Sequence, residues 1–111
     1  MAETISVREF IDEHGRSVFA KWFDGLNVQA ATKVTIALTR LELGNFSNVK
    51  GVGEGVMEYR IDSGPGYRIY FGKEGNTLVI LLCGGTKSGQ DRDIKLAKQL
   101  WKHYKQLKKG I

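Results

Sequence analysis

Two arginines, a glutamate and a tyrosine are the side chains of this sequence whose types and spacing favour chemistry. Glu58 and Arg60 alternate with apolar residues in one segment, and Arg68 and Tyr70 do the same in the next. Because alternate side chains of a strand face the same side, each pair points to one face. Two guanidinium groups can hold a phosphate through paired hydrogen bonds, and a neighbouring tyrosine can stack on a base. The cluster therefore predicts a site for a phosphate-bearing ligand.

The hairpin between these two segments decides which side chains share a face. Placing Ile61 opposite Ile69 aligns the apolar faces of both strands and requires a five-residue loop over residues 63–67. A four-residue loop would put Arg68 into the core, where an unpaired charge is costly. This register predicts an exposed cluster on the middle of a sheet. Its opposed pairs are Glu58 with Gly72, Arg60 with Tyr70, and Asp62 with Arg68.

Two lysines extend the predicted cluster. Lys50 and Lys87 lie in glycine-bearing loops on either side of it and can add positive charge. The alternative is a solvated sheet face in which Arg60 simply pairs with Glu58 or Asp62. The residue types alone leave both interpretations open.

Neither a metal site nor a cofactor site is predicted. The one cysteine, Cys83, lies in an apolar run, and the two histidines, His14 and His103, are far apart in the sequence. These residues lack the spacing of metal ligands. Cys83 is interpreted as a buried structural thiol, and the histidines as surface residues.

A strand and two helices are predicted before the cluster. Weak alternation over residues 4–7 indicates a short strand. Apolar residues recur at three- and four-residue steps over residues 12–26, which indicates a helix with an aromatic ridge. Asn27 is a suitable N-cap for a second helix that ends at Gly44, and the short connection predicts an antiparallel hairpin. The expected buried stripe of the second helix is Ala31, Val34, Leu38 and Leu41.

Three strands and a last helix complete the expected fold. The strands cover residues 57–61, 67–72 and 77–83, and the last is apolar on both faces, which favours a central position in the sheet. The final helix covers about residues 90–108. The sequence thus predicts an α+β fold in which a helical hairpin packs on one face of a mainly antiparallel sheet. The apolar face of the final helix consists of Ile94, Ala97, Leu100, Trp101, Tyr104 and Leu107.

Composition and charge bound the class of protein. A length of 111 residues with 41% hydrophobic and 26% charged residues predicts one globular domain over residues 1–111 and excludes a disordered chain. The sequence shows no signal-peptide pattern and no apolar run of about 20 residues, so we expect a cytoplasmic protein. The net charge of +5 is uneven, since the last 25 residues carry +6 and the first 86 carry −1. The basic end predicts an anionic partner.

Two long motifs carry a family resemblance. Residues 44–71 follow the pattern GNxxxxKxVGxGVxExRIxxGPGYRxYF, and residues 81–94 follow LLxGGxKxxQxxDI. Together with the aromatic residues Phe19, Trp22 and Phe23, these motifs cover most of the chain. In them the sequence resembles the RelE/ParE toxin superfamily, and more narrowly its HigB-like addiction-module killer proteins.

The resemblance implies a RelE-like β-α-α-β-β-β core with a C-terminal helix, acting as the toxin of a type II toxin-antitoxin pair. RelE- and HigB-type members cut messenger RNA in the ribosomal A site, whereas ParE-type members poison DNA gyrase. One scaffold hosts both activities, so the fold does not choose between them. We expect a ribosome-dependent mRNA endoribonuclease that inhibits translation by metal-free attack of the 2′-hydroxyl. The alternatives are a ParE-like gyrase poison and a non-toxic regulator paired with an antitoxin.

The resemblance also implies roles for the basic residues of the cluster. Arg60 and Arg68 match strand positions that bind phosphate and stabilise the transition state. Lys50 is similar to a basic residue in the loop before the second strand, and Lys87 to one after the fourth. These four residues are the expected cationic part of the site.

Proton transfer is not assigned to a single pair. Metal-free cleavage needs a base for the 2′-hydroxyl proton and an acid for the leaving 5′-oxygen. Glu58 is a candidate base, and Lys87 or Tyr70 a candidate acid. Relatives with clear nuclease activity often carry Tyr or His after the last strand, where this sequence reads Gln-Asp-Arg-Asp-Ile over residues 90–94.

The implied partners are a cognate antitoxin, of the HigA-like helix-turn-helix type, and the ribosome with its mRNA; no membrane partner is expected. The last helix carries lysines on the side opposite its apolar face. Such a charged face suits docking on ribosomal RNA better than reading of a base sequence, and plain solvation is the alternative. These lysines are Lys95, Lys98, Lys102, Lys105 and Lys109.

Overall fold

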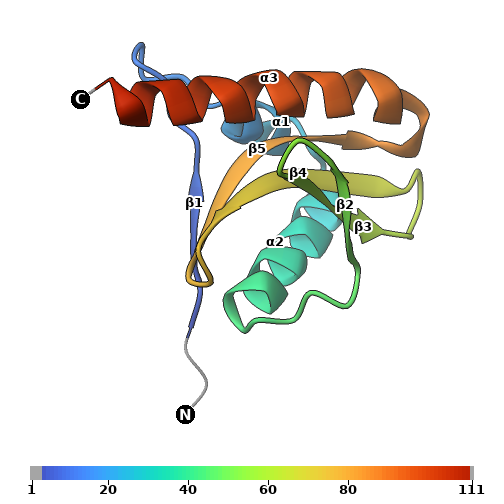
Figure 1. The fold of residues 1–111 in the computed structure, drawn as a ribbon. Helices are drawn as coiled ribbons and strands as arrows, with labels where there is room; N and C mark the ends of the chain where they lie inside the picture. Colours follow the sequence, from blue (N-terminus) through green and yellow to red (C-terminus); the bar gives the residue numbers. More distant parts are fainter. Residues whose placement is uncertain (1–3, 111) are drawn as a thin grey trace.

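The computed structural model describes residues 4–110 and shows a five-stranded sheet with helices on both faces (Figure 1). The strand order is β1-β5-β4-β3-β2, with β1 parallel to β5 and the other neighbours antiparallel. The predicted α+β class with a mainly antiparallel sheet is confirmed. In chain order the elements are β1 (Ser6–Glu9), α1 (Val18–Asp24), α2 (Val28–Glu42), β2 (Val49–Gly53), β3 (Val56–Ile61), β4 (Tyr67–Glu74), β5 (Leu78–Thr86), a 3-10 turn η1 (Lys87–Gly89) and α3 (Gln90–Lys109).

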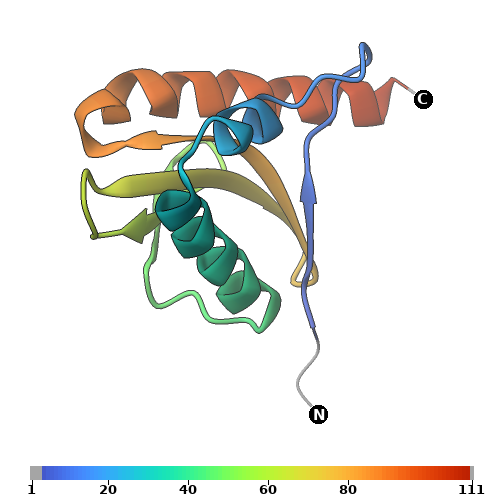
Figure 2. The same cartoon turned by 180° about the vertical axis from the view of Figure 1, so that it is seen from behind.

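The helices divide between the two faces of the sheet. α1 packs mainly against β5, and α2 packs against β1 and β3 on the same face, while α3 crosses the opposite face (Figures 1 and 2). The predicted placement of two helices on one face is therefore correct. β5 lies between β1 and β4, which confirms its predicted central position.

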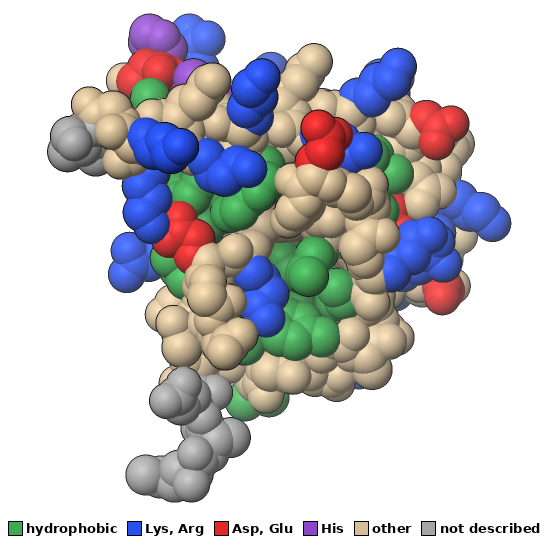
Figure 3. Space-filling model, viewed as in Figure 1, with side chains coloured by type: hydrophobic (Ala, Val, Ile, Leu, Met, Phe, Trp, Pro, Cys, Tyr) green, Lys and Arg blue, Asp and Glu red, His purple; other side chains and the backbone are tan. Residues whose placement is uncertain are grey.

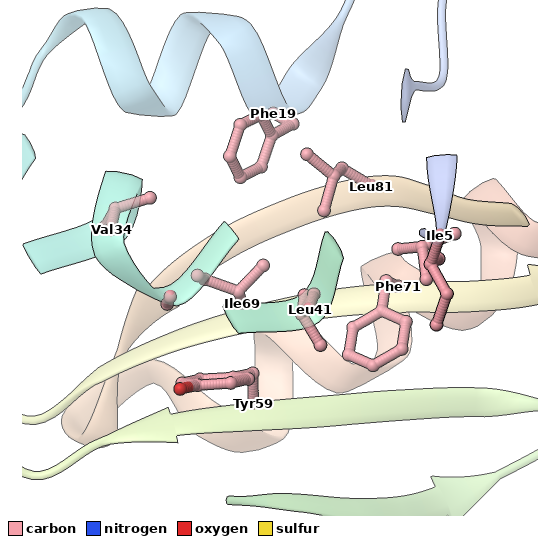
Figure 4. Close-up of a cluster of buried hydrophobic side chains, with 10 residues drawn as sticks. Ile5, Phe19, Val34, Leu41, Tyr59, Ile69, Phe71 and Leu81 are labelled. Atoms are coloured by element: carbon pink, nitrogen blue, oxygen red, sulfur yellow. The ribbon is translucent and has the colours of Figure 1, made fainter. Parts of the chain in front are cut away.

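The core beneath α1 and α2 is built from aromatic and branched side chains of every layer. Phe19 of α1 and Val34 of α2 point at the sheet, where Ile69 and Phe71 of β4 meet them (Figure 4). All four are buried, and full burial of such a side chain stabilises a fold by about 1.5–3 kcal/mol. This core therefore determines which face of β3 and β4 is turned toward α1 and α2, and so away from α3.

The first two elements begin later than predicted. The strand expected over residues 4–7 covers Ser6–Glu9, and the helix expected from Asp12 begins at Val18. The Asp12 carboxylate accepts hydrogen bonds from the backbone N–H groups of His14, at 2.8 Å, and Arg16, at 3.0 Å. These bonds form a turn, and Ser17 then caps the helix by accepting from the Ala20 N–H at 3.0 Å.

The second helix agrees with its predicted signals. The Asn27 side chain accepts from the Ala30 N–H at 2.8 Å, and Gly44 stops the helix with φ +79. Leu38 and Ala31 are half-buried rather than buried, because the helix is rotated slightly from the expected phase. Its buried residues are Ala30, Val34, Ala37 and Leu41.

The segment before β3 is a strand, not the predicted glycine-rich loop. β2 pairs with β3 and places Lys50 opposite Glu58, so the sheet has five strands instead of four. The chain reverses at Glu54 and Gly55, both of which have positive φ. A glycine-rich stretch is a weak strand former, and the pairing with β3 overrides that weakness here.

The β3–β4 register differs from the predicted one by two residues, since Ile69 pairs with Tyr59 instead of Ile61. Ile61 lies opposite Tyr67 and Tyr59 opposite Ile69, so the loop covers residues 62–66. Gly66, at φ +74, donates its N–H to the Ser63 carbonyl at 3.1 Å and so closes the turn before Tyr67. Because the shift is even, every side chain keeps its predicted face.

α3 follows its predicted bounds closely and packs on a glycine. A Cβ atom at Gly72 of β4 would lie 2.4 Å from Cζ3 of Trp101, so the indole ring rests directly on the β4 backbone. Trp22 of α1 lies in the same way on Gly84 of β5, on the other face. Within residues 4–110, the structure contains no helix with the length and apolar character needed to cross a membrane.

Candidate functional site

Two rows of paired residues cross the sheet face under α3. The predicted common face of the two arginines, the glutamate and the tyrosine is confirmed by the strand register. Lys50 also belongs to this face, because it lies opposite Glu58. One row is Lys50, Glu58, Tyr70 and Cys83, and the next is Arg60, Arg68 and Gly85.

Three of the four residues of the cluster are buried, which corrects the prediction that the whole cluster is exposed. Glu58 and Tyr70 are 0% exposed and Arg68 is 4% exposed. The apolar stripe of α3 needs an apolar surface, and α1 and α2 already cover the other face of the sheet. The last helix therefore packs on the apolar residues of this face, among them Tyr70, and its first turn reaches Glu58 through Gln90.

Glu58 accepts hydrogen bonds from three side chains. Its Oε1 accepts from Nε of Arg60 at 2.9 Å, and its Oε2 accepts from the Tyr70 hydroxyl at 3.0 Å and from Nε2 of Gln90 at 2.7 Å. The carboxylate thus joins β3, β4 and the first turn of α3. Such charge-assisted bonds are about twice as strong as neutral ones.

The network shifts the pKa of both acids in it. Burial raises the pKa of Glu58, but the hydrogen bonds from Arg60, Gln90 and Tyr70 outweigh burial, so this pKa lies below its ordinary value. Burial and the neighbouring Glu58 charge raise the pKa of Tyr70 well above its usual range. Glu58 is therefore ionised and Tyr70 neutral at physiological pH.

Arg60 is the member of the network that reaches solvent. Its Nε is held by Glu58, yet 40% of its side chain is exposed. It faces Lys50 across a hollow of about 250 Å³, which we call the Lys50 hollow. The structure thus brings these two predicted residues together at the surface. The lining residues are Ser47, Asn48, Val49, Lys50, Arg60 and Asp62.

Arg68 lies directly opposite Arg60, but few of its hydrogen-bond donors have a partner. Its Nη1 donates to the Tyr67 carbonyl at 3.1 Å and lies 3.7 Å from Oδ1 of Asp62, whose side chain is 85% exposed. Its Nε is buried and has no hydrogen-bond partner among residues 4–110. An unpaired buried donor costs free energy, so Arg68 is a strained member of the site.

Lys87 stands outside the buried network. It begins the turn η1, its side chain is exposed, and its backbone N–H donates to the Gly66 carbonyl at 2.8 Å. A Cβ atom at Gly66 would lie 3.3 Å from Cβ of Lys87 and 3.5 Å from Nη1 of Arg68. Gly66 therefore separates the two predicted site residues.

Two further residues of α3 belong to the site, and neither is among the predicted site residues. Gln90 donates to Glu58, and the Asp93 carboxylate lies so close to Gly85 that a Cβ there would be 1.9 Å from its Oδ2. Burial raises the pKa of Asp93. The sequence pattern could have identified both residues. Gln90 and Asp93 lie three or four residues apart in line with Ala97 and Trp101, so they continue the face of the helix that packs on the sheet.

The lysines of α3 form a basic surface along the helix (Figure 3). Lys95 and Lys102 are exposed, as predicted. Nζ of Lys98 lies 3.4 Å from Oε2 of Glu54, and Nζ of Lys105 lies 5.7 Å from the centroid of the Trp101 ring. The structure thus shows a lysine-bearing helix face in which two of the lysines contact other parts of the protein, and docking on ribosomal RNA stays a prediction.

The remaining candidate metal ligands do not form a cluster. Cys83 is a buried free thiol, and burial raises its pKa to about 12. His103 contacts Glu13 through Nε2 at 3.0 Å, away from the arginines. Residues 4–110 contain no group of three or more His, Cys, Asp or Glu side chains arranged to hold a metal ion.

Comparison with known proteins places the chain in a family. Residues 21–102 match the model of the phage-derived Gp49-like proteins, which includes α2, all of β2 to β5 and most of α3. An uncharacterised protein of Haemophilus influenzae is 49% identical over 83 residues, which are 74% of this chain and 84% of that relative. The family match over residues 21–102 includes both arginines and the glutamate that holds Arg60. The chain therefore belongs to the family of Gp49-like phage-derived proteins.

Proposed function

We propose that this protein is the toxin of a type II toxin-antitoxin pair and cuts ribosome-bound mRNA without a metal. The proposal rests on one observation, which is that Arg60 is held by a buried carboxylate and is also exposed to solvent. The buried Glu58 carboxylate holds its Nε at 2.9 Å, while 40% of the side chain is exposed and Arg60 lines the Lys50 hollow. A cation fixed in this way is suited to stabilise charge that develops on a phosphate.

In the proposed reaction the 2′-hydroxyl of the RNA attacks the adjacent phosphorus, and the 5′-oxygen leaves. Arg60 and Lys50 stabilise the extra negative charge of the pentavalent phosphorane. Glu58 orients Arg60 and is not the base, because it is buried and already accepts three hydrogen bonds. Tyr70 has a positioning role for the same reason, and Lys87 is the accessible candidate acid. The base comes from the ribosome or its RNA.

The test uses purified protein and ribosomes programmed with a defined mRNA. Primer extension should map cuts within translated codons. Arg60→Ala should reduce the cutting rate by about 100-fold or more, as expected for the loss of one transition-state donor. Arg16→Ala is the matched control, because Arg16 is exposed in the turn before α1. An intact mRNA with folded wild-type protein would contradict the proposal.

A non-enzymatic role is the second candidate. It is favoured by the burial of Glu58, Tyr70 and Arg68, which leaves those groups without access to a substrate while α3 is in place. Two proteins of this kind are a ParE-like gyrase poison and a non-toxic regulator. The first would produce gyrase-DNA cleavage complexes and an SOS response with intact mRNA, and the second would cause no growth defect.

A helix-turn-helix antitoxin of the HigA-like type is the proposed partner in each case. The experiment is co-expression with the product of the adjacent reading frame. Growth arrest by the toxin alone and its relief by that product would support the pairing. Absence of any complex between the two purified proteins would count against it.

A further inference from the structure

A second hollow opens on the other side of Arg60, between α2 and the end of β3. Its volume is about 330 Å³, and we call it the α2 hollow. It shares Asn48, Arg60 and Asp62 with the Lys50 hollow, so the two hollows adjoin at these residues, and together we call them the channel. The α2 hollow is lined by Lys33, Ile36, Ala37, Arg40, Asn48, Tyr59, Arg60, Ile61, Asp62 and Ser63.

The charge of the channel is positive. Lys33, Arg40 and Arg60 line the α2 hollow, and Lys50 lines the adjoining one. Asp62 is the single acid among these lining residues of the described chain. A concave surface lined by several cations concentrates anions near it. The Lys33 ammonium group donates to the Ser63 hydroxyl, which holds this lysine at the rim.

The floor of the α2 hollow is apolar. Ile36, Ala37 and Ile61 contribute to it, and Ile36 is 47% exposed although it is a large aliphatic residue. Asn48 and Ser63 add an amide and a hydroxyl. Ligand pockets typically start at about 300 Å³ and combine apolar walls with a few polar groups, so the hollow has room for one nucleotide.

The spacing of the cations suits a polyanion rather than a single phosphate. Lys33 and Arg40 are seven residues apart on α2, which is about 10.5 Å along the helix. A stacked strand places one phosphate about every 3.4 Å, so the two cations span about three phosphate steps. Arg60 then connects this row to the Lys50 hollow.

We propose that this channel binds single-stranded RNA beside the Arg60 site. One nucleotide lies in the α2 hollow, and neighbouring phosphates contact Lys33 and Arg40. The inference rests on the proposed function, because that function makes RNA the ligand of the adjoining site. An acidic protein segment would also satisfy the cations, but it would not require a nucleotide-sized hollow with an apolar floor.

The experiment measures binding of an uncleavable probe to the full chain. A fluorescent ten-nucleotide RNA carrying 2′-O-methyl groups is titrated with protein at salt concentrations between about 50 and 200 mM. The variant K33Q/R40Q should bind about tenfold more weakly. The slope of log affinity against log salt should fall by about 1.4, since each lost phosphate contact on a single strand accounts for about 0.7. Circular dichroism verifies that the variant is folded.

The matched control is R16Q/K21Q, which removes the same charge near α1. Equal losses in both variants would overturn the proposal, because binding would then follow net charge alone. Unchanged affinity and slope in K33Q/R40Q would overturn it as well, and so would displacement of the RNA by polyglutamate of equal charge at equal concentration. Because the probe cannot be cut, a missing ribonuclease activity with intact, channel-dependent binding would contradict only the proposed function.

Discussion

Glu58 is the residue on which the buried network depends, since one carboxylate receives donors from β3, β4 and α3. Glu58→Gln keeps the shape but removes the charge that these donors stabilise. We expect the variant to lose about 2 kcal/mol of unfolding free energy at pH 7, as for a hydrogen bond to a charged group. Urea unfolding of both proteins measures this difference.

The pH dependence gives an independent test of the same residue. The folded-state pKa of Glu58 is below its ordinary value of 4.5, so its contribution is complete above that value and is lost as the pH falls through the folded pKa. The stability difference between wild type and Glu58→Gln should therefore shrink below about pH 4. A difference that stays constant down to pH 3 would show that the charge is not what the network stabilises.

Arg68 is expected to show a conflict between stability and function. Its Nε is buried without a partner, and its nearest acid is exposed. Arg68→Met should therefore be neutral or raise the unfolding free energy by about 1 kcal/mol. The mRNA cutting rate should fall, because Arg68 lies opposite Arg60 and its charge adds to the positive potential there although its side chain is buried. Thermal unfolding and the ribosome cutting assay measure the two effects. A strongly destabilised Arg68→Met protein would mean that the guanidinium supports the fold.

At the scale of elements, the packing of α3 depends on the glycine beneath Trp101. In Gly72→Ala the new Cβ would lie 2.4 Å from the indole, so the ring or the helix must move. We expect a loss of about 1–3 kcal/mol of unfolding free energy, as for other overpacked cores.

Gly51→Ala in β2 is the control for this substitution, because a Cβ there meets nothing within 4 Å. The control should change stability by less than about 0.5 kcal/mol. A smaller ring in the double variant Gly72→Ala/Trp101→Leu should restore part of the loss. Equal effects of the two alanine substitutions would show that α3 is not held by this contact.

The sequence was sufficient for the face of each site residue but not for its exposure. Alternation places Glu58 with Arg60 and Arg68 with Tyr70, and both pairs stay on one side because the observed register differs from the predicted one by two residues, an even shift. Exposure depends on which surface the last helix packs against. The apolar stripe of that helix does not identify this surface. The burial of the cluster is thus a tertiary property.

Local signals also explain which boundaries were predicted correctly. Asn27 and Gly44 mark α2 because capping and left-handed φ act within a few residues. The start of α1 was predicted too early, since the turn made by the Asp12 side chain competes with helix formation. β2 was missed because its stability comes from pairing with β3.

For the whole molecule, charge asymmetry predicts how the protein meets a polyanion. The last 25 residues carry +6, and Lys95 and Lys102 of α3 are exposed. K95Q/K102Q should weaken ribosome binding and lower its salt dependence, because fewer counterions are released. Co-sedimentation at two salt concentrations measures this.

The variant K98Q serves as a comparison, because Lys98 lies 3.4 Å from Glu54 and part of its charge is compensated. Its effect per lysine should be smaller than that of Lys95 and Lys102. Ribosome binding that is indifferent to all three substitutions would mean that the basic helix face is only solvated.

The parallel pairing of β1 with β5 has a consequence for how the chain is made. Ser6 pairs with Leu78, so β1 must wait for a partner that is synthesised 72 residues later. Contacts between such distant residues form slowly. α3 is translated later still, and until it emerges the face with Glu58 and Arg68 has no cover. A nascent chain therefore exposes for a time the surface that the finished protein hides.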